Sequence, residues 1–430
     1  MTPTHSIHRL RAALPSINAA LFASLFFFLP GHVAPAYTLT GLILILSLLE
    51  GGFAAKWALL RRDPLFWIFQ AFFWLFPLSL LWAEDTHAGL KMVGRYTFFL
   101  LSPLYLTIAR RELAPRCIAF FLAGCAMTEA LAYYNWLQML YFPDWPRGLR
   151  VRKDLEDTAP FVDHILYAPI LAWAGYLAAR RALSGALSQR IGYALLTVAT
   201  LGNLVFSGGR AGQLALLVLL VVLVFQRIAK RPAVAALVSL ALVSSIAAVS
   251  YTSNDYLRGR VDETIRETMQ SKKSVTTSTG QRFTFYANSL RLFAENPLIG
   301  VGAGDFEQEY TRINELHSPG WVGTNNPHNQ YLFVLTTTGL LGGAILVLTY
   351  FPPIVWRRRH DPLAQLRVGL VVFMGFISLF EDYLWRSNTS LLFVLFAALL
   401  LSQRSLGGDP APPAGRMNPQ GRQAAANRAE

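Results

Sequence analysis

Charged residues are scarce in this sequence of 430 residues. They make up 15% of the chain, whereas soluble domains carry roughly 25%. Hydrophobic residues make up 53%, and the mean hydropathy is +0.38. The composition excludes an ordinary soluble enzyme. It also excludes disorder of the chain as a whole, because disordered chains are poor in apolar residues. A membrane protein is indicated.

Cysteine is almost absent as well. Cys117 and Cys125 are the two cysteines, and they lie in one apolar segment. On a helix they would be about 12 Å apart along the axis, which is too far for a disulfide bond. No second histidine or cysteine stands at zinc-ligand spacing near His328, so we expect neither a zinc site nor a cofactor.

Acidic residues are outnumbered, with 25 Asp and Glu against 38 Lys and Arg and a net charge of +13. The basic residues do not cluster on a soluble domain, so nucleic acid is not an expected partner. Apolar runs dominate instead, near residues 14–30, 37–53, 65–82, 93–109, 116–140, 161–179, 191–206, 211–226, 233–250, 329–351, 366–380 and 389–403. Because a helix needs about 20 apolar residues to cross a bilayer, we predict an all-α integral membrane protein of about twelve transmembrane helices.

Lysine and arginine are concentrated in alternate loops and in both terminal segments. The basic loops contain Lys56/Arg61/Arg62, Arg110/Arg111/Arg116, Arg180/Arg181/Arg190, Arg227/Lys230/Arg231 and Arg357/Arg358/Arg359/Arg367. Since such loops stay on the cytoplasmic side, both termini are predicted to be cytoplasmic.

This orientation divides the chain. Residues 1–250 are expected to hold the first nine spans with an outward loop at 141–160. A large helical outward loop follows at 251–327, then three spans at 328–404 and a disordered cytoplasmic tail at 405–430. Within the large loop we expect helices at Asp255–Met269, Arg282–Ala294 and Phe306–Asn314, and a flexible piece at 271–279.

Arginines on the outward side are unusual and suggest a phosphate site, because guanidinium groups bind phosphate through bidentate bonds. The first outward loop carries Arg147, Arg150, Arg152 and Lys153. These residues can equally reach lipid headgroups or pair with Asp154, Glu156 and Asp157. The acidic residues Asp154 and Glu156 leave a second alternative open, in which they hold a divalent ion.

Two further arginines are stronger candidates. Arg210 ends the run Ser207-Gly208-Gly209 between two apolar segments, where the glycines are expected to permit a tight turn and to offer N–H groups to an anion. An isolated arginine at membrane depth indicates function. Arg282 follows Gly280 at a predicted helix start, where the helix dipole also favours an anion. Arg291 is out of phase with Arg282 and should not share its role.

The motif Asn325-Asn326-Pro327-His328-Asn329-Gln330-Tyr331-Leu332 lies where the large loop enters the tenth span. We expect Asn326 to cap that helix and His328 to lie on its first turn. A histidine there suits a general base that accepts a hydroxyl proton, although a lone histidine at a helix end is often structural.

These motifs together resemble those of bacterial O-antigen ligases and their polymerase relatives. The resemblance rests on Ser-Gly-Gly-Arg-Ala-Gly from Ser207, on Gly-Gln-Arg from Gly280 followed by Asn296-Pro297-Leu298-Ile299-Gly300-Val301-Gly302, and on the Asn-Pro-His-Asn-Gln-Tyr-Leu element. It implies a GT-C-like, inverting, metal-independent glycosyltransferase of the bacterial inner membrane. Its periplasmic site moves O-antigen from undecaprenyl pyrophosphate to a lipid A–core sugar hydroxyl.

The resemblance also assigns roles: Arg210 and Arg282 bind pyrophosphate, and His328 acts as the base or orients the donor. Further candidates for contacts with pyrophosphate or acceptor are Asn326, Asn329 and Tyr331 of the last motif, and Arg147 and Arg152 of the first outward loop, which matches no motif of the family. The alternatives are an O-antigen polymerase, a pilin oligosaccharyltransferase of the same superfamily and, from another class, an inorganic-ion transporter.

Overall fold

The computed structural model describes residues 3–146, 157–253, 258–259, 262, 278–351, 361 and 363–401. Every regular element within these ranges is a helix. The elements are α1 (Pro3–Phe28), α2 (Ala34–Glu50), α3 (Phe53–Leu60), α4 (Pro64–Ser79), α5 (Thr86–Arg95), α6 (Thr97–Leu100), α7 (Ser102–Ile108), η1 (Arg111–Leu113), α8 (Ala114–Leu140), α9 (His164–Ala182), α10 (Leu187–Phe206), α11 (Arg210–Arg227), α12 (Pro232–Ser253), α14 (Ser278–Glu295), α15 (Phe306–His317), α16 (Gln330–Tyr350), α18 (Ala364–Ile377) and α19 (Ser387–Leu401).

Several of these helices are apolar enough to cross a membrane. Among the described residues, four are long enough as well, and a fifth span results if α2 and α3, bent by 117° at their junction, count as one. The four are Arg111–Leu140, Arg210–Arg227, Pro232–Val249 and Gln330–Tyr350, and shorter apolar helices accompany them. The helical membrane-protein architecture agrees with the sequence, while the number of about twelve spans and the size of the outward loop stay predictions.

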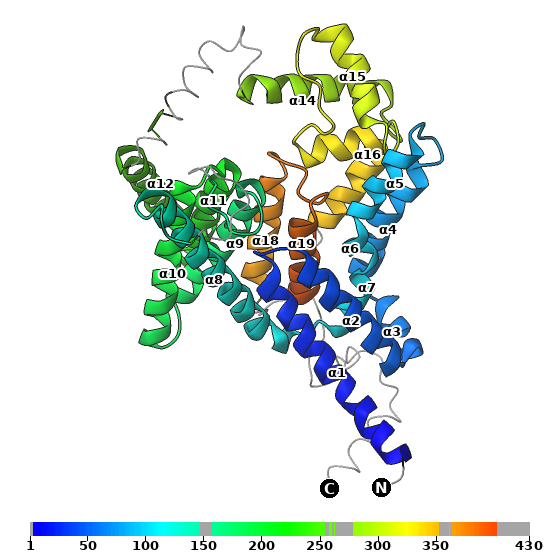
Figure 1. Cartoon of the computed structure of the whole chain (residues 1–430), viewed down its shortest axis with the longest axis vertical. Coiled ribbons are helices and arrows are strands. Elements are labelled where there is room, and N and C mark those ends of the chain that lie inside the picture. Colours follow the sequence, from blue (N-terminus) through cyan, green and yellow to red (C-terminus); the bar gives the residue numbers. More distant parts are fainter. Residues whose placement is uncertain are drawn as a thin grey trace.

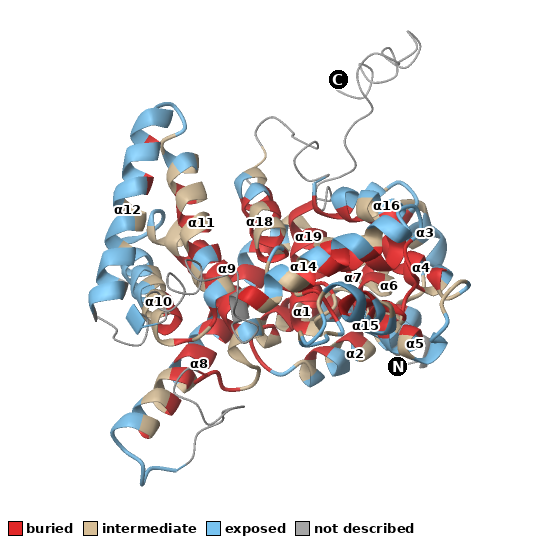
Figure 2. Ribbon diagram, turned by 90° about the horizontal axis from the view of Figure 1, so that it is seen from above, coloured by how far each residue is buried: buried red, intermediate tan, exposed pale blue. Residues whose placement is uncertain are grey.

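The outer faces of α10 and α12 are exposed (pale blue in Figure 2), and they carry apolar side chains. Leu195 and Val198 of α10 are each 66% exposed, and Leu237 of α12 is 68% exposed. An apolar surface of this extent is costly in water. These helices therefore present their outer faces to lipid.

The centre of the bundle is formed by α9 and α19, which are largely buried (Figure 2). Helix α9 packs against α10 and α11, and α19 packs against α18, α6 and α7. Trp173 of α9 stacks on Phe373 of α18 and meets Phe396 of α19 edge to face. The two central helices thus join the halves of the bundle and give the site a rigid base.

Helix α16 is sharply kinked at Gly339, which has φ 65° and ψ −162°. The kink leaves backbone groups of α16 without helical partners, and the loop 297–302 supplies them. The bonds run from Val301 N to Thr336 O (2.9 Å), Gly302 N to Thr337 O (3.0 Å), Leu340 N to Pro297 O (2.8 Å) and Leu341 N to Leu298 O (3.3 Å). Because unpaired buried backbone groups are costly, the loop and the kink stabilise each other.

Helices α14 and α15 cover one end of the bundle (Figure 1), and we call these two helices the cap. Both carboxylate oxygens of Asp305 accept backbone bonds of 2.8 Å, from Glu84 N and Asp85 N. Ser79 Oγ at the end of α4 accepts a bond from Ala303 N (3.0 Å). These bonds fasten the cap to the α4–α5 connection.

The cap confirms two of the helices expected in the large loop. The stretch expected at 282–294 is observed as α14, and the stretch expected at 306–314 is observed as α15. The expected helix at 255–269 lies mostly outside the described residues, as do the piece at 271–279, apart from its last two residues, and the whole tail at 405–430. The two free cysteines are both buried, in agreement with the sequence.

Candidate functional site

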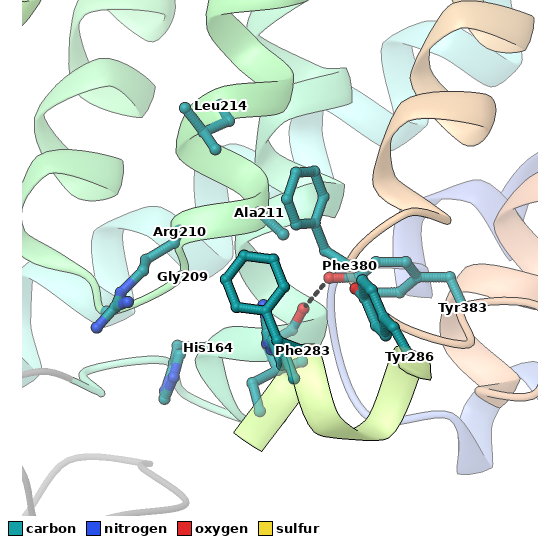
Figure 3. Close-up of a pocket in the computed structure, with 12 residues that line it drawn as sticks. His164, Gly209, Arg210, Ala211, Leu214, Phe283, Tyr286, Phe380 and Tyr383 are labelled. Atoms are coloured by element: carbon teal, nitrogen blue, oxygen red, sulfur yellow. Dashed lines mark hydrogen bonds between the residues drawn. The ribbon is translucent and has the colours of Figure 1, made fainter. Parts of the chain in front are cut away.

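A cavity of about 460 Å³ opens beneath the cap, between α9, α11, α14 and the α18–α19 connection (Figure 3). It is lined by His164, Ile165, Gly208, Gly209, Arg210, Ala211, Leu214, Arg282, Phe283, Tyr286, Phe380 and Tyr383. The described lining residues include two arginines and a histidine, and no carboxylate. The cavity is therefore suited to an anionic group, with an apolar wall beside it.

Arg210 is the first residue of α11, and Gly209 is its N-cap. The chain turns from α10 to α11 within residues 207–209, and glycine here also serves close packing. Gly209 has φ −77°, so it makes no turn that requires glycine. A Cβ atom on Gly209 would lie 2.2 Å from Ala168 Cβ, and one on Gly212 would lie 2.3 Å from Ala168 C. The glycines let α11 approach α9 closely, which puts Arg210 beside the start of α9.

Arg282 reaches the same cavity from the cap. Arg282 and Tyr286 are four residues apart on α14, so they share one face of this helix, and both line the cavity. The structure thus brings together the two arginines that the sequence singled out, although 72 positions separate them in the chain. Tyr286 Oη donates a 2.7 Å bond to Leu379 O, and burial raises the pKa of its phenol. It therefore stays a neutral donor.

His164 also lines the cavity, and the sequence analysis did not single it out. It begins α9, next to the Arg210 side (Figure 3). Its Nδ1 lies 3.0 Å from Oδ2 of Asp157, whose side chain is 1% exposed, and its backbone N–H donates to the same oxygen (3.2 Å). The carboxylate fixes the ring and leaves Nε2 as the nitrogen for a ligand.

His328 lies just before α16 in a left-handed backbone conformation, with φ 52°. The expected helix start was wrong: α16 begins at Gln330, and its N-cap is Asn329, which accepts from Tyr331 N (3.0 Å) and Leu332 N (3.1 Å). Left-handed conformation is uncommon for residues other than glycine. Here Asn326 Oδ1 holds it by accepting from His328 N (2.9 Å).

The ring of His328 is held as firmly as its backbone. Nδ1 lies 2.8 Å from Oε2 of Glu381 in the α18–α19 connection, and Phe285 of α14 stacks on the ring at 5.8 Å between centroids. Glu381 is 3% exposed, while the histidine side chain is 31% exposed. Arg386 donates to the other oxygen of Glu381 (3.2 Å). The arrangement holds the ring through Nδ1, so Nε2 is the nitrogen that can meet a ligand.

The two acidic neighbours in this connection differ in charge. Burial by itself would raise the pKa of Glu381, but Asp382, His328 and Arg386 hold it well below the usual range. Burial and the adjacent Glu381 raise the pKa of Asp382 well above its usual range. The pair thus carries one negative charge, on Glu381, where it faces His328.

The remaining candidates are placed outside the cavity or outside the described residues. Asn326 and Asn329 are buried and make the backbone bonds given above, and Tyr331 Oη donates to Gly375 O (2.8 Å). None of these three lines the cavity. Arg291 binds Oδ1 of Asn288 (2.7 Å) and is absent from the lining, as its phase predicted.

The middle of the first outward loop lies outside the described residues, although Asp157, which holds His164, belongs to its described end. Arg147, Arg150, Arg152, Lys153, Asp154 and Glu156 lie outside the described residues. Within the described ranges, no group of three or more His, Cys, Asp or Glu side chains is placed to hold a metal ion. The phosphate role of Arg147 and Arg152 and the possible acidic metal site stay untested.

Two carboxylate–histidine pairs are thus the features of the candidate site that the motifs did not reveal. Glu381 is 53 positions from His328, and Arg386 lies five positions further on. A signal existed for Glu381: two adjacent acids lie between the apolar runs 366–380 and 389–403. For His164 the signal was weaker, because its neighbour Asp163 reads as an ordinary helix cap, which it is.

The apolar helices indicate a multi-pass membrane protein, and an arginine-lined cavity lies under its helical cap. Residues 195–347 match the family model described as O-antigen ligase. This match supports the assignment of the chain to the O-antigen ligase-type superfamily and confirms the resemblance. The matched range contains Arg210, Arg282 and His328, but not His164 or Glu381. A comparison with curated proteins found no match.

Proposed function

We propose that the protein is a glycosyltransferase that moves O-antigen polysaccharide from undecaprenyl pyrophosphate to a lipid A–core sugar hydroxyl. Transfer takes place at the periplasmic face of the bacterial inner membrane, and the anomeric centre is inverted. The observation that carries the proposal is the pairing of a cationic cavity with a carboxylate-held histidine on the adjoining side of α14. The family match supports the superfamily.

The donor pyrophosphate occupies the cavity. Arg210 from α11 and Arg282 from α14 neutralise its charge from two sides, and His164 supplies a third contact. Charge-assisted hydrogen bonds of this kind strengthen as negative charge develops on the leaving oxygen. Among the described lining residues, no carboxylate competes for the arginines.

The acceptor sugar approaches from the His328 side. Its hydroxyl oxygen attacks C1 of the donor sugar, and its proton passes to Nε2 of His328. The bond from C1 to the phosphate oxygen breaks, and its electron pair leaves with the pyrophosphate. Glu381, ionised and hydrogen-bonded to Nδ1, stabilises the imidazolium that forms. Attack from the side opposite the leaving group gives inversion.

α14 connects the two halves of the site. Arg282 and Tyr286 face the cavity, while Phe285, on the next position of the helix, stacks on His328. Tyr286 also donates to His328 O (3.4 Å). Correct placement of α14 therefore sets the distance between base and leaving group, which transfer requires.

The test is a transfer assay with purified protein, polyprenyl-pyrophosphate glycan and lipid A–core, with and without EDTA. A glycan ladder on the core lipid that survives EDTA supports a metal-independent ligase. A ladder that is lost and then restored by a divalent ion moves catalysis to an acidic metal site such as Asp154 and Glu156. Growth of the polyprenyl-linked glycan alone identifies a polymerase.

A further inference from the structure

A second arginine-lined cavity, of about 330 Å³, lies between η1, α8, α9 and α18. It is lined by Arg111, Ala114, Pro115, Ile118, Leu177, Arg180, Arg181, Ser184, Leu363 and Leu366. The polar members are three arginines and a serine, and the rest are apolar. The cavity thus has a cationic wall and an apolar wall.

The charges around this cavity are not balanced. Arg111 (3.3 Å) and Arg367 (2.5 Å) share one buried carboxylate, that of Asp361. Arg180 donates to the neutral amides of Gln365 (2.5 Å) and Gln226 (3.3 Å). In the described part of the chain, neither Arg180 nor Arg181 has a carboxylate within salt-bridge distance. Positive charge therefore remains for an anion.

The position of the cavity relative to a membrane follows from α9. This helix begins at His164 in the candidate site and reaches Arg180 and Arg181 in its last turn. At 1.5 Å per residue, His164 and Arg180 are about 24 Å apart. The hydrocarbon core of a bilayer is about 30 Å thick. The two cavities therefore lie near opposite headgroup layers, with the apolar bundle between them.

We propose that the second cavity binds the headgroup of an anionic phospholipid from the leaflet opposite the candidate site. Arg180 and Arg181 hold its phosphate, and Ser184 lies beside them. The acyl chains leave along the apolar wall formed by Ile118, Leu177 and Leu366. This wall favours a lipid over a free phosphate, because a free phosphate has no apolar part to bury against it. Basic cavities between helices at a membrane surface bind such headgroups.

The bound lipid would add a further link between α9 and α18 at this end, beside the bonds that Arg180 (2.5 Å) and Tyr176 (3.3 Å) of α9 donate to Gln365 of α18. Arg180 belongs to α9, and Leu363 precedes α18. At their other ends, α9 begins with His164 of the candidate site, and α18 leads into the connection that holds Glu381. Occupation of the cavity should therefore raise the thermal stability of the bundle, because a ligand that binds only the folded state stabilises it.

The experiment is native mass spectrometry of the delipidated full-length protein, titrated with cardiolipin or phosphatidylcholine. We expect cardiolipin to bind more tightly than phosphatidylcholine. Arg181→Gln should weaken cardiolipin binding about fivefold, and the further change Arg180→Gln should weaken it by a similar factor. Arg181→Lys keeps the positive charge that attracts the anionic headgroup and should bind within about twofold of the wild type.

Arg62→Gln is the matched control. Arg62 is exposed and lies just before α4, at the end of the bundle away from the cap, because the other end of α4 contacts the cap. The substitution therefore removes one cation at the same end as the second cavity without changing its lining. Equal binding of both lipids, or equal losses in Arg62→Gln and Arg181→Gln, would overturn the proposal. Displacement of cardiolipin by inorganic pyrophosphate at matched concentration would also overturn it, because the site would then be one for small anions.

Discussion

His328 is a histidine whose backbone and ring are both fixed by neighbours, and this makes its substitution informative. As a general base it should contribute about 10²–10⁴ to the rate. We expect His328→Gln to lower kcat by that factor. Glu381→Gln should lower it by at least about tenfold, since one charge-assisted hydrogen bond contributes about 1.5–3 kcal/mol. The measurement is the rate of glycan transfer to lipid A–core with purified variants.

Glu381 is a positioning residue in this scheme, so its variant has a second readout. Glu381→Asp keeps the charge and should recover part of the rate, while donor binding stays unchanged in all three variants. Wild-type rates in a well-folded His328→Gln protein would remove His328 from the mechanism.

His164 belongs to the donor side of the site, and its substitution should act on binding. It lines the cavity with Arg210 and is oriented by the buried Asp157. We expect His164→Gln to raise the Kd for undecaprenyl pyrophosphate about tenfold, the effect of one lost charge-assisted bond. Binding of a fluorescent analogue to protein in nanodiscs measures it. His317→Gln, which changes an exposed histidine at the end of α15, is the control, and an equal change in both variants contradicts the role.

Asp382 gives a prediction on stability and pH. Its pKa is raised in the folded protein by burial and by Glu381. Between the ordinary Asp pKa of about 3.9 and the raised value, the unfolded chain releases a proton that the folded protein keeps, so stability falls as pH rises. Asp382→Asn cannot ionise and should raise the unfolding temperature at pH 7–8. The gain should shrink towards pH 4, as thermal unfolding at several pH values will show.

Sequence reasoning found the arginines because an isolated charge between apolar runs is visible locally. It found His328 through its motif, but it placed the residue on a helix turn and missed the left-handed φ. The sequence assigned the N-cap of α16 to the wrong residue, because Asn326 and Asn329 are equally good N-caps by residue type. The bond from Gln330 N to Ser378 O (2.9 Å) fixes where α16 starts, and that partner is 48 positions away.

At the scale of elements, the kink in α16 and the loop 297–302 form one unit. Gly300 has φ 69°, and a Cβ atom there would lie 2.4 Å from Thr337 C and 2.5 Å from Thr338 N. We expect Gly300→Ala to destabilise the protein by at least about 2 kcal/mol, because both backbone strain and a clash with backbone oppose it. Thermal unfolding in detergent is the measurement.

Gly323→Ala is the matched control for this change, since nothing lies within 4 Å of the Cβ position and its φ is not positive. Equal unfolding temperatures for the two alanine variants would show that the loop yields without cost. The kink itself could not have been predicted, because Gly339 sits in an apolar run like other glycines that tolerate a regular helix.

Element positions were otherwise well predicted by composition, since apolar length is a local property. Each predicted apolar run coincides with one or more observed helices. The run at 93–109 is not one continuous helix, because it is divided among α5, α6 and α7. Residues 96 and 101 interrupt it with bonds of the 3₁₀ type, such as Tyr96 N to Val93 O (3.0 Å). Such breaks depend on packing, so hydropathy could not reveal them.

For the whole molecule, the remaining question is which face of the membrane carries the cap. The two native cysteines are buried and should not react with a membrane-impermeant maleimide. Cysteines can therefore be introduced singly at exposed positions of opposite ends, as Gly323→Cys beside the cap and Arg62→Cys before α4. Because basic loops remain cytoplasmic, we expect Gly323→Cys to be labelled in cells with a permeabilised outer membrane, and Arg62→Cys only after the inner membrane is opened. Labelling of both from the same side would contradict the prediction that these two ends lie on opposite sides of the membrane. The reverse pattern would place the cavity under the cap on the cytoplasmic side, and it would contradict glycan transfer at the periplasmic face.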